Sequence, residues 1–291
     1  MAFDLVTLGN YTQDTIVSAA GARRVDGGGF AYAAHAARVC GLSVAAVTRL
    51  ARQDMPVLDP LRGAGIQVFA HESPHSTLLR LEYPSSNVDE RVVSVTQRAE
   101  PFRPEHVAPL EARCFVVNAS IRGEVPVDVV EALRSKAHLV GLDVQGFLRV
   151  VAPDGRLAHR EWPEKERVLA MVDVLKADAV EAEFLTGTSD LRDAARALAA
   201  LGPREVVLTH GEGVLVLAEG AFHAAPFRPQ VLRGRSGRGD TCIGAYAARR
   251  LSAPAAEATR WAAAVTSLKL EAEGPIRRTA SDVEAFLRAS G

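Results

Sequence analysis

Short β-prone segments alternate with helix-periodic segments along most of this chain. The expected strands are residues 3–9, 42–50, 115–119, 139–144, 177–180 and 206–209, and the expected helices are residues 29–39, 127–136, 164–175 and 191–201. Strands that alternate with helices form β-α-β units, whose parallel strands are covered by helices on both faces. The sequence therefore predicts an α/β fold with a mostly parallel central sheet.

One region breaks this alternation. Residues 77–83 and 91–97 are β-prone and flank the turn-forming residues 84–87 with no helix between them. This pattern predicts an antiparallel hairpin outside the main sheet, long enough to act as a lid. A second hairpin is expected from residues 206–209 to 214–217. With no low-complexity linker or internal repeat, we expect a single domain over residues 1–291, with a β lid contributed by about residues 10–26 and 70–100.

Composition excludes several classes of function. The 291 residues carry a formal net charge of -1, so no overall field attracts nucleic acid or an anionic membrane. Charges interrupt every apolar run well before the ~20 residues of a membrane span. The first four residues lack the basic and apolar segments of a secretory signal, and the three cysteines are widely separated, which is typical of reduced thiols. We expect a cytoplasmic protein with neither nucleic-acid nor membrane partners.

The segment from Gly234 to Asp240, followed by small helix-forming residues, carries the clearest chemical signal. Glycines at 237 and 239 allow several backbone amides to approach one anion, and a helix that begins there adds its partial positive charge. Asp240 lies in the first turn of that helix, where a carboxylate can take a proton from an attacking hydroxyl. An ordinary capped helix after a flexible loop fits this short motif equally well.

Five motifs in order along nearly the whole chain resemble those of the ribokinase-like (PfkB) carbohydrate kinases. They are residues 9–14, the glycines at 27–29 with the helix that ends near Gly41, the Glu-containing segment 181–187, the turn 209–213, and the Gly237-Arg238-Gly239-Asp240 loop. The resemblance implies a three-layer ribokinase-like sandwich with a small β lid. It also implies phosphoryl transfer to a sugar-like hydroxyl, with ATP as the usual donor and Mg²⁺ as cofactor.

The resemblance also implies a role for each matching residue. Asp240 is the expected base, in a catalytic loop with Gly237, Arg238 and Gly239, whose amides form the anion hole. The expected acceptor site contains Asn10, Asp14, Gly28 and Tyr32; the expected nucleotide site contains Thr209, Gly211, Gly213 and Gly239; and Glu181 is expected to organise Mg²⁺ through water. A homodimer formed through the lid is a further expectation.

Other residues depart from the family pattern or resemble one branch of it, and they bear on which class of substrate is expected. Tyr32 and Asp178 stand where many members have Asn, and Gly234-Arg235 replaces the usual Asp-Thr. A segment with Asp143, Gln145 and Arg149, together with Tyr32, resembles the myo-inositol kinase branch and implies contacts to a neutral polyol; a turn cap and a surface ion pair are the plain alternatives. A nucleoside kinase and a non-catalytic binding protein with the kinase fold are the competing functions.

Overall fold

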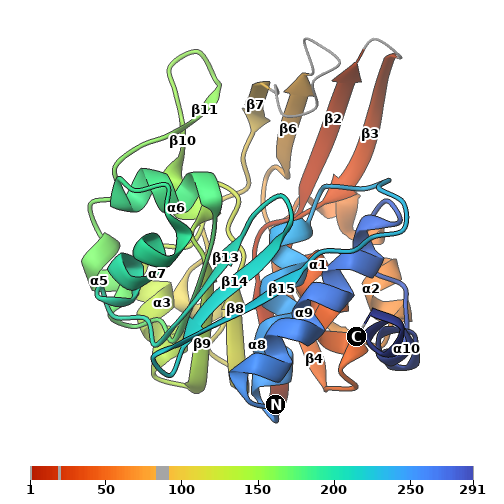
Figure 1. The fold of residues 1–291 in the computed structure, drawn as a ribbon. Helices are drawn as coiled ribbons and strands as arrows, with labels where there is room; N and C mark the ends of the chain where they lie inside the picture. Colours follow the sequence, from red (N-terminus) through yellow and green to blue (C-terminus); the bar gives the residue numbers. More distant parts are fainter. Residues whose placement is uncertain (1, 19–20, 83–91, 291) are drawn as a thin grey trace.

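A nine-stranded sheet forms the centre of the molecule (Figure 1). The computed structural model describes residues 2–18, 21–82 and 92–290. Across the sheet the strand order is β15-β14-β13-β12-β9-β8-β1-β4-β5. The bounds are β1 Ala2–Leu8, β4 Val44–Leu50, β5 Gln67–Glu72, β8 Glu111–Val117, β9 Ala137–Asp143, β12 Val174–Asp178, β13 Glu205–Thr209, β14 Gly213–Ala218 and β15 Ala221–Pro226.

The sheet is parallel from β5 to β13 and antiparallel only at the β13-β14-β15 edge. The predicted hairpin joins β13 to β14, with Thr209 opposite Val214. Parallel strands end at the same edge of a sheet, and in such folds ligands bind beyond their carboxyl ends. This arrangement confirms the predicted α/β fold with a mostly parallel central sheet.

Helices cover both faces of the sheet (Figure 1). One face carries α1, α2, α8, α9 and α10, and the other carries α3, α5, α6 and α7. The bounds are α1 Gly29–Val39, α2 Asp59–Gly63, α3 Val127–Arg134, α4 Gln145–Leu148, α5 Lys165–Leu169, α6 Ala179–Thr186, α7 Leu191–Ala199, α8 Arg238–Arg250, α9 Ala255–Leu270 and α10 Ala280–Ser290, with 3₁₀ helices at Arg52–Leu58 and Pro104–His106.

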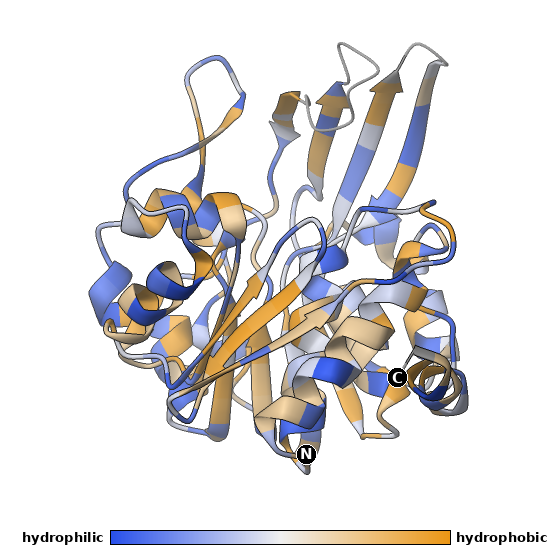
Figure 2. Ribbon diagram, in the orientation of Figure 1, coloured by the Kyte–Doolittle hydropathy of each residue, from blue (hydrophilic) through white to orange (hydrophobic). Residues whose placement is uncertain are grey.

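The apolar core lies between the sheet and these two helical layers. Figure 2 shows hydrophobic strands at the centre and mixed colouring on the outer helices. Helices α1 and α8 approach each other closely, because a Cβ on Gly244 would lie 2.5 Å from the backbone oxygen of Ala33. This contact brings the N-termini of α1 and α8 to the same end of the molecule.

A separate four-stranded sheet, which we call the small sheet, extends beyond the carboxyl edge of the main sheet (Figure 1). Its strand order is β3-β2-β6-β7, with bounds β2 Thr12–Ser18, β3 Gly21–Gly27, β6 Thr77–Glu82 and β7 Val92–Gln97. Strands β6 and β7 pair antiparallel, while the predicted turn at residues 84–87 lies outside the described residues. The short hairpin β10 Arg149–Val151 and β11 Leu157–His159 meets β7 through a bridge between Ser94 and Arg156.

The prediction was wrong around residues 164–180. A long helix over 164–175 and a strand over 177–180 were expected, whereas α5 ends at Leu169, β12 occupies Val174–Asp178 and α6 begins at Ala179. Strand β12 is buried on both faces, so its apolar run has no alternation that would distinguish it from a helix.

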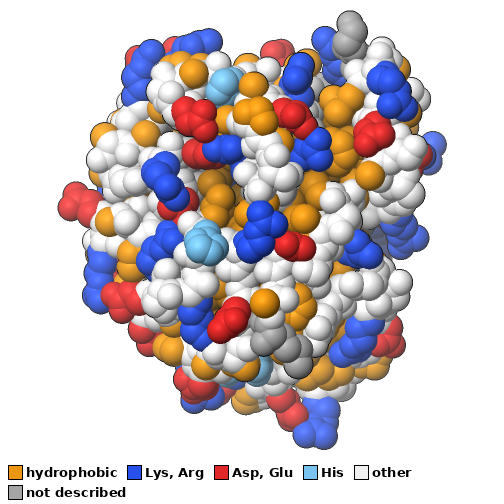
Figure 3. Space-filling model, turned by 90° about the horizontal axis from the view of Figure 1, so that it is seen from below, with side chains coloured by type: hydrophobic (Ala, Val, Ile, Leu, Met, Phe, Trp, Pro, Cys, Tyr) orange, Lys and Arg blue, Asp and Glu red, His pale blue; other side chains and the backbone are white. Residues whose placement is uncertain are grey.

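The surface shows no large field of one sign on the face in Figure 3, where acidic and basic side chains are interspersed. Among the residues that the structure describes, no helix is both long and apolar enough to cross a membrane.

Candidate active site

The predicted glycine loop leads directly into α8. Gly237 caps the helix with a φ of 74°, a backbone conformation that favours glycine. A Cβ at this position would also lie 2.2 Å from the ring of Tyr32. The amides of the first turn have no intrahelical acceptors, so they and the positive end of the helix dipole form a site for an anion.

Asp240 lies in the first turn of α8, and its carboxylate faces the N-terminus of α1. A Cβ on Gly29 would lie 2.2 Å from Asp240 Oδ1, so a side chain there would displace the carboxylate. Asn118 Nδ2 donates to the same oxygen at 3.0 Å. Burial raises the pKa of Asp240, while Lys176, the Asn118 hydrogen bond and Arg149 oppose that rise. Asp240 is thus a carboxylate held between two helix N-termini.

A cluster of buried charges lies beneath the anion site. Lys176 Nζ is 3.0 Å from Asp143 Oδ2 and 3.7 Å from Glu181 Oε2, and a Cβ on Gly239 would lie 2.4 Å from the same nitrogen. Burial disfavours the charged form of Lys176, but these two carboxylates outweigh it and raise its pKa. The cluster therefore places a fixed positive charge next to the Gly239 backbone.

This cluster includes Asp143, whose carboxylate pairs with Lys176 and is 2% exposed. The predicted contact of this carboxylate with substrate stays a prediction. Gln145 donates its backbone N–H to Asp143 Oδ1 at 3.0 Å. Neither Lys176 nor Asn118 was predicted, although a lone lysine inside the apolar strand β12 is a signal that could have been used.

Glu181 fits the predicted role near a metal ion. Asp178 caps α6, and the two residues exchange backbone-to-carboxylate hydrogen bonds of 2.8 Å. The second oxygen, Glu181 Oε1, is buried and has no hydrogen-bond partner in the structure, which leaves it available to a metal-bound water. Among the described residues, no group of three His, Cys, Asp or Glu side chains could hold a metal directly. In proteins Mg²⁺ usually keeps several waters and binds one or two carboxylates together with substrate phosphates.

A cavity of about 400 Å³ lies beside the N-terminus of α8. Arg235 and Arg238 line it together with apolar side chains. The lining residues are Asp178, Ala179, Val180, Thr209, His210, Gly211, Phe227, Pro229, Leu232, Arg235, Arg238 and Leu270. The predicted nucleotide-site residues Thr209 and Gly211 line this cavity. Gly213 does not; a Cβ there would lie 2.5 Å from the backbone oxygen of Ala225.

The predicted acceptor residues lie where β1, the small sheet and α1 meet. The backbone N–H of Asn10 donates to buried Glu124 Oε1 at 2.5 Å, and the backbone N–H of Ser120 donates to Oε2 of the same carboxylate at 3.0 Å. Gly28 has a φ of 114°, and a Cβ there would lie 2.7 Å from the Asn10 backbone oxygen. Asp14 lies in β2. The Asn10 backbone oxygen and the Asp14 carboxylate thus lie beside the glycines at 27–29, and Asp240 faces the last of these glycines.

Tyr32 and Arg149 are two further residues that we predicted to bind substrate. The ring of Tyr32 is 5% exposed and packs against Gly237. Arg149, at the start of β10, is half-buried, and its charge lowers the pKa values of Asp240 and Glu181. Tyr32 thus contacts the glycine loop, and Arg149 acts on Asp240 through its charge.

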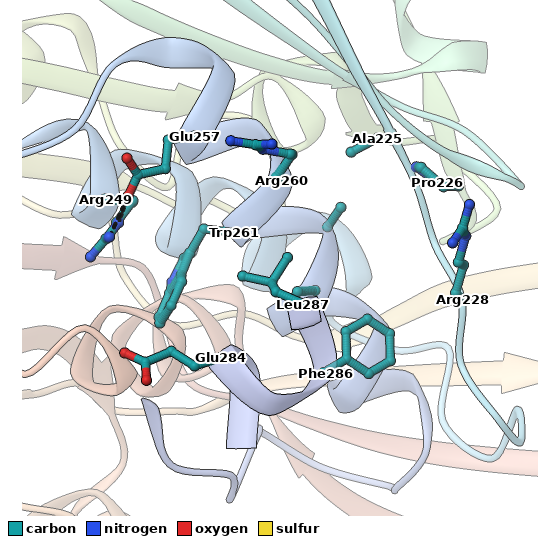
Figure 4. Close-up of a pocket in the computed structure, with 12 residues that line it drawn as sticks. Ala225, Pro226, Arg228, Arg249, Glu257, Arg260, Trp261, Glu284, Phe286 and Leu287 are labelled. Carbon is teal, nitrogen blue, oxygen red and sulfur yellow. Dashed lines mark hydrogen bonds and ion pairs between the residues drawn. The ribbon is translucent and has the colours of Figure 1, made fainter. Parts of the chain in front are cut away.

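A second cavity, of about 380 Å³, lies between β15, α9 and α10 (Figure 4). The Arg249–Glu257 ion pair borders it, with the Arg249 guanidinium 4.9 Å from the Trp261 ring centroid. Phe286 and Leu287 of α10 also line it. None of the predicted site residues is among its lining residues, so it is separate from the site around Asp240.

Comparisons with known proteins agree with this geometry. The sequence matches the pfkB family of carbohydrate kinases over residues 1–281. It is 33% identical to a pyrophosphate-dependent kinase in the ribokinase family, solved in complex with a pyrophosphate analog and myo-inositol; the match covers 97% of this chain and 99% of that chain, with a TM-score of 0.89. A sulfate complex of a pyrophosphate-dependent kinase in the ribokinase family is 34% identical over 97% of this chain and 99% of that chain, with a TM-score of 0.90.

A curated cytidine kinase from Thermococcus kodakarensis (strain ATCC BAA-918 / JCM 12380 / KOD1) is 26% identical over 255 residues, which are 84% of this chain and 87% of that protein. Kinases of this family are phosphotransferases that act on sugars or nucleosides. The family match spans nearly all of the chain, and the glycine loop, the Asp240 carboxylate and the fold agree with it. This chain belongs to the pfkB family of carbohydrate kinases.

Proposed function

We propose that this protein transfers a phosphoryl group to a hydroxyl of myo-inositol or a closely related neutral polyol. The observation that carries the proposal is the position of the Asp240 carboxylate, which lies in the first turn of α8 and is fixed by Asn118 at 3.0 Å. The neighbour that is 33% identical was solved with myo-inositol, which supports the choice of acceptor.

In the proposed reaction, Asp240 accepts the proton of the attacking hydroxyl. The hydroxyl oxygen then forms a bond to the terminal phosphorus of the donor as the bond from that phosphorus to the leaving oxygen breaks. The amides of residues 237–239, Arg238 and the α8 dipole stabilise the charge on the transferred group. When bound, Mg²⁺ would neutralise charge on the donor phosphates, and Glu181 would hold one of its waters.

The acceptor would lie between Asp240 and the small sheet. Hydroxyls of a neutral polyol are hydrogen-bond donors, and Asn10, Asp14 and backbone oxygens near Gly28 offer acceptors for them. Gln145 and Arg149 extend this polar wall from the β9 end. Closure of the small sheet would exclude water, which otherwise competes with the polyol as nucleophile. A dimer formed through the small sheet stays a prediction.

For the donor, we propose pyrophosphate and retain ATP as the alternative. ATP is the donor that the sequence resemblance implies, and Phe227 and Leu232 offer apolar surface for its adenine ring. Pyrophosphate has no nucleobase to bury, so its affinity must come from contacts to its charged oxygens. Arg235 and Arg238 provide guanidinium groups for such contacts in the donor cavity. The two neighbours at 33% and 34% identity are pyrophosphate-dependent.

A nucleoside kinase is the second candidate function. The curated relative at 26% identity is a cytidine kinase, and Phe30, Tyr32 and Phe147 are aromatic residues near the predicted site. Phe30 and Phe147 are 1% and 5% exposed, however, which leaves little ring surface for a base to stack on. A non-catalytic binding protein would have no need of a positioned carboxylate at Asp240.

The test is a matrix of donors and acceptors with purified protein and Mg²⁺. Pyrophosphate and ATP are each paired with myo-inositol, other cyclitols, sugars and nucleosides, and product is detected as the phosphorylated acceptor by mass spectrometry. Turnover of myo-inositol, lost in Asp240→Asn, supports the proposal. Turnover of nucleosides alone refutes the polyol acceptor but keeps the mechanism. Donor binding without turnover of any acceptor favours the binding protein.

A further inference from the structure

Lys269 is a buried cation for which the proposed mechanism has no use. It lies in the last turn of α9 and is 1% exposed. Burying an ammonium group is costly unless it gains compensating contacts. Its Nζ donates to the backbone oxygen of Gly234 at 2.8 Å and lies 5.3 Å from the centroid of the Tyr32 ring, within the range of a cation–π contact.

These contacts reach the segment that leads into the anion site. The amides of Arg233 and Gly234 both donate to the Leu270 carbonyl, at 2.9 and 3.1 Å. A Cβ on Gly234 would lie 2.3 Å from the Ala272 backbone oxygen, so the loop touches the end of α9 with no space for a side chain. The lysine hydrogen bond completes this attachment, and its charge is favourable at a helix C-terminus.

The Lys269 ammonium group also reaches Gly237, at the other end of the loop, through the ring of Tyr32. Tyr32, whose ring faces Lys269, is the residue that packs against Gly237. Lys269 therefore contacts the loop directly at Gly234 and through Tyr32 at Gly237. Burial lowers the pKa of Lys269 to about 8, and the carboxylates of Asp240 and Glu273 act against that shift.

We propose that Lys269 is a positioning residue, an internal ammonium ion that holds the loop of residues 234–237 in the conformation that binds the phosphate of the donor. The inference rests on the proposed phosphoryl transfer, because it concerns the same anion site. The Lys269 side chain places a monovalent positive charge from the chain itself next to the Gly234 carbonyl.

The experiment compares Lys269→Ala, Lys269→Met and wild type, with Lys165→Met on α5 as the matched control. Turnover is first measured in tetramethylammonium chloride, whose cation is too bulky for the space that a lysine side chain leaves. It is then measured with potassium or ammonium chloride in place of that salt, at constant ionic strength. We expect wild type and Lys165→Met to be indifferent to the cation. Both Lys269 variants should lose about 10- to 100-fold in kcat/KM for the donor, as loop misplacement would cause.

Rescue separates this role from simple packing. Lys269→Ala leaves a space next to the Gly234 carbonyl, so ammonium or potassium should restore much of its activity, whereas the methionine side chain fills that space and should prevent rescue. Circular dichroism melting checks that each variant is folded. Wild-type activity in Lys269→Met, or a folded Lys269→Ala that no cation restores, would overturn the proposal.

Donor affinity provides a readout that does not depend on turnover. Calorimetric titration with pyrophosphate and with ATP first identifies the donor that wild type binds. The affinity of Lys269→Met for that donor should be weaker than the affinity of wild type. Equal affinity would overturn the positioning role. Failure of wild type to phosphorylate any polyol would instead count against the proposed acceptor and leave this comparison intact.

Discussion

Replacing Gly29 with alanine tests the position of Asp240 without removing its carboxylate. The new Cβ would lie 2.2 Å from Asp240 Oδ1 and 2.9 Å from Asn118 Cβ, closer than the 3.0 Å that real Cβ contacts respect. The carboxylate or the start of α1 must therefore move by about 1 Å. Misplacement of this size costs about 100-fold in rate, or about 2.7 kcal/mol in the activation barrier.

The assay is kcat/KM for the acceptor with a saturating donor, alongside thermal melting. Gly29 is the first residue of α1, so the atoms that must move lie at the start of the helix, and we expect Gly29→Ala to lose activity while it stays folded. Gly63→Ala is the control, because a Cβ at this helix end meets no atom within 4 Å. A folded Gly29→Ala with kcat/KM within about twofold of wild type would refute the assigned geometry.

Three further predictions follow from the same contacts. Asp240→Asn should lower kcat by about 10²–10⁴-fold while donor affinity stays near wild type, as kinetics and calorimetry will report; unchanged kcat would remove Asp240 from the role of base. Arg238→Ala and Arg235→Ala should each raise KM for pyrophosphate by about tenfold and more than KM for ATP, since guanidinium contacts are a larger share of pyrophosphate binding; equal effects on both donors would contradict a pyrophosphate site. Burial raises the pKa of Glu124 from 4.5 to about 7. As pH rises, the unfolded protein therefore loses this proton before the folded protein does. The free energy of unfolding, measured in urea, should then fall by up to about 3 kcal/mol between about pH 4.5 and 7. That decrease should be smaller in Glu124→Gln, and an identical pH dependence in the two proteins would show that Glu124 is not its source.

Local signals in the sequence predicted the fold and the position of Asp240 in the first turn of a helix. The helix over residues 29–39 was predicted with its observed bounds, because a glycine run leads into an alanine-rich segment. The glycine loop predicted a helix that starts just before Asp240, and α8 begins at Arg238. These features depend on backbone preferences of neighbouring residues, which sequence patterns report directly.

The residues that surround Asp240 could not be predicted in the same way. Asn118 follows β8 and Lys176 lies in β12, and they approach Asp240 and the Gly239 backbone only because of the order of strands in the sheet. The burial of Lys269 could not be predicted either, since a lysine in the last turn of a helix is normally exposed. Such contacts join distant parts of the chain, and one sequence without homologues carries no pairing signal for them.

The close contact between Gly244 of α8 and Ala33 of α1 joins two helices that lie far apart in the sequence. Gly29 and Asp240 face each other at the start of the same two helices, so a substitution that separates α1 from α8 would also move the Asp240 carboxylate away from Gly28 and Gly29. Exchanges at this helix contact are therefore expected to alter the site without touching any of its residues.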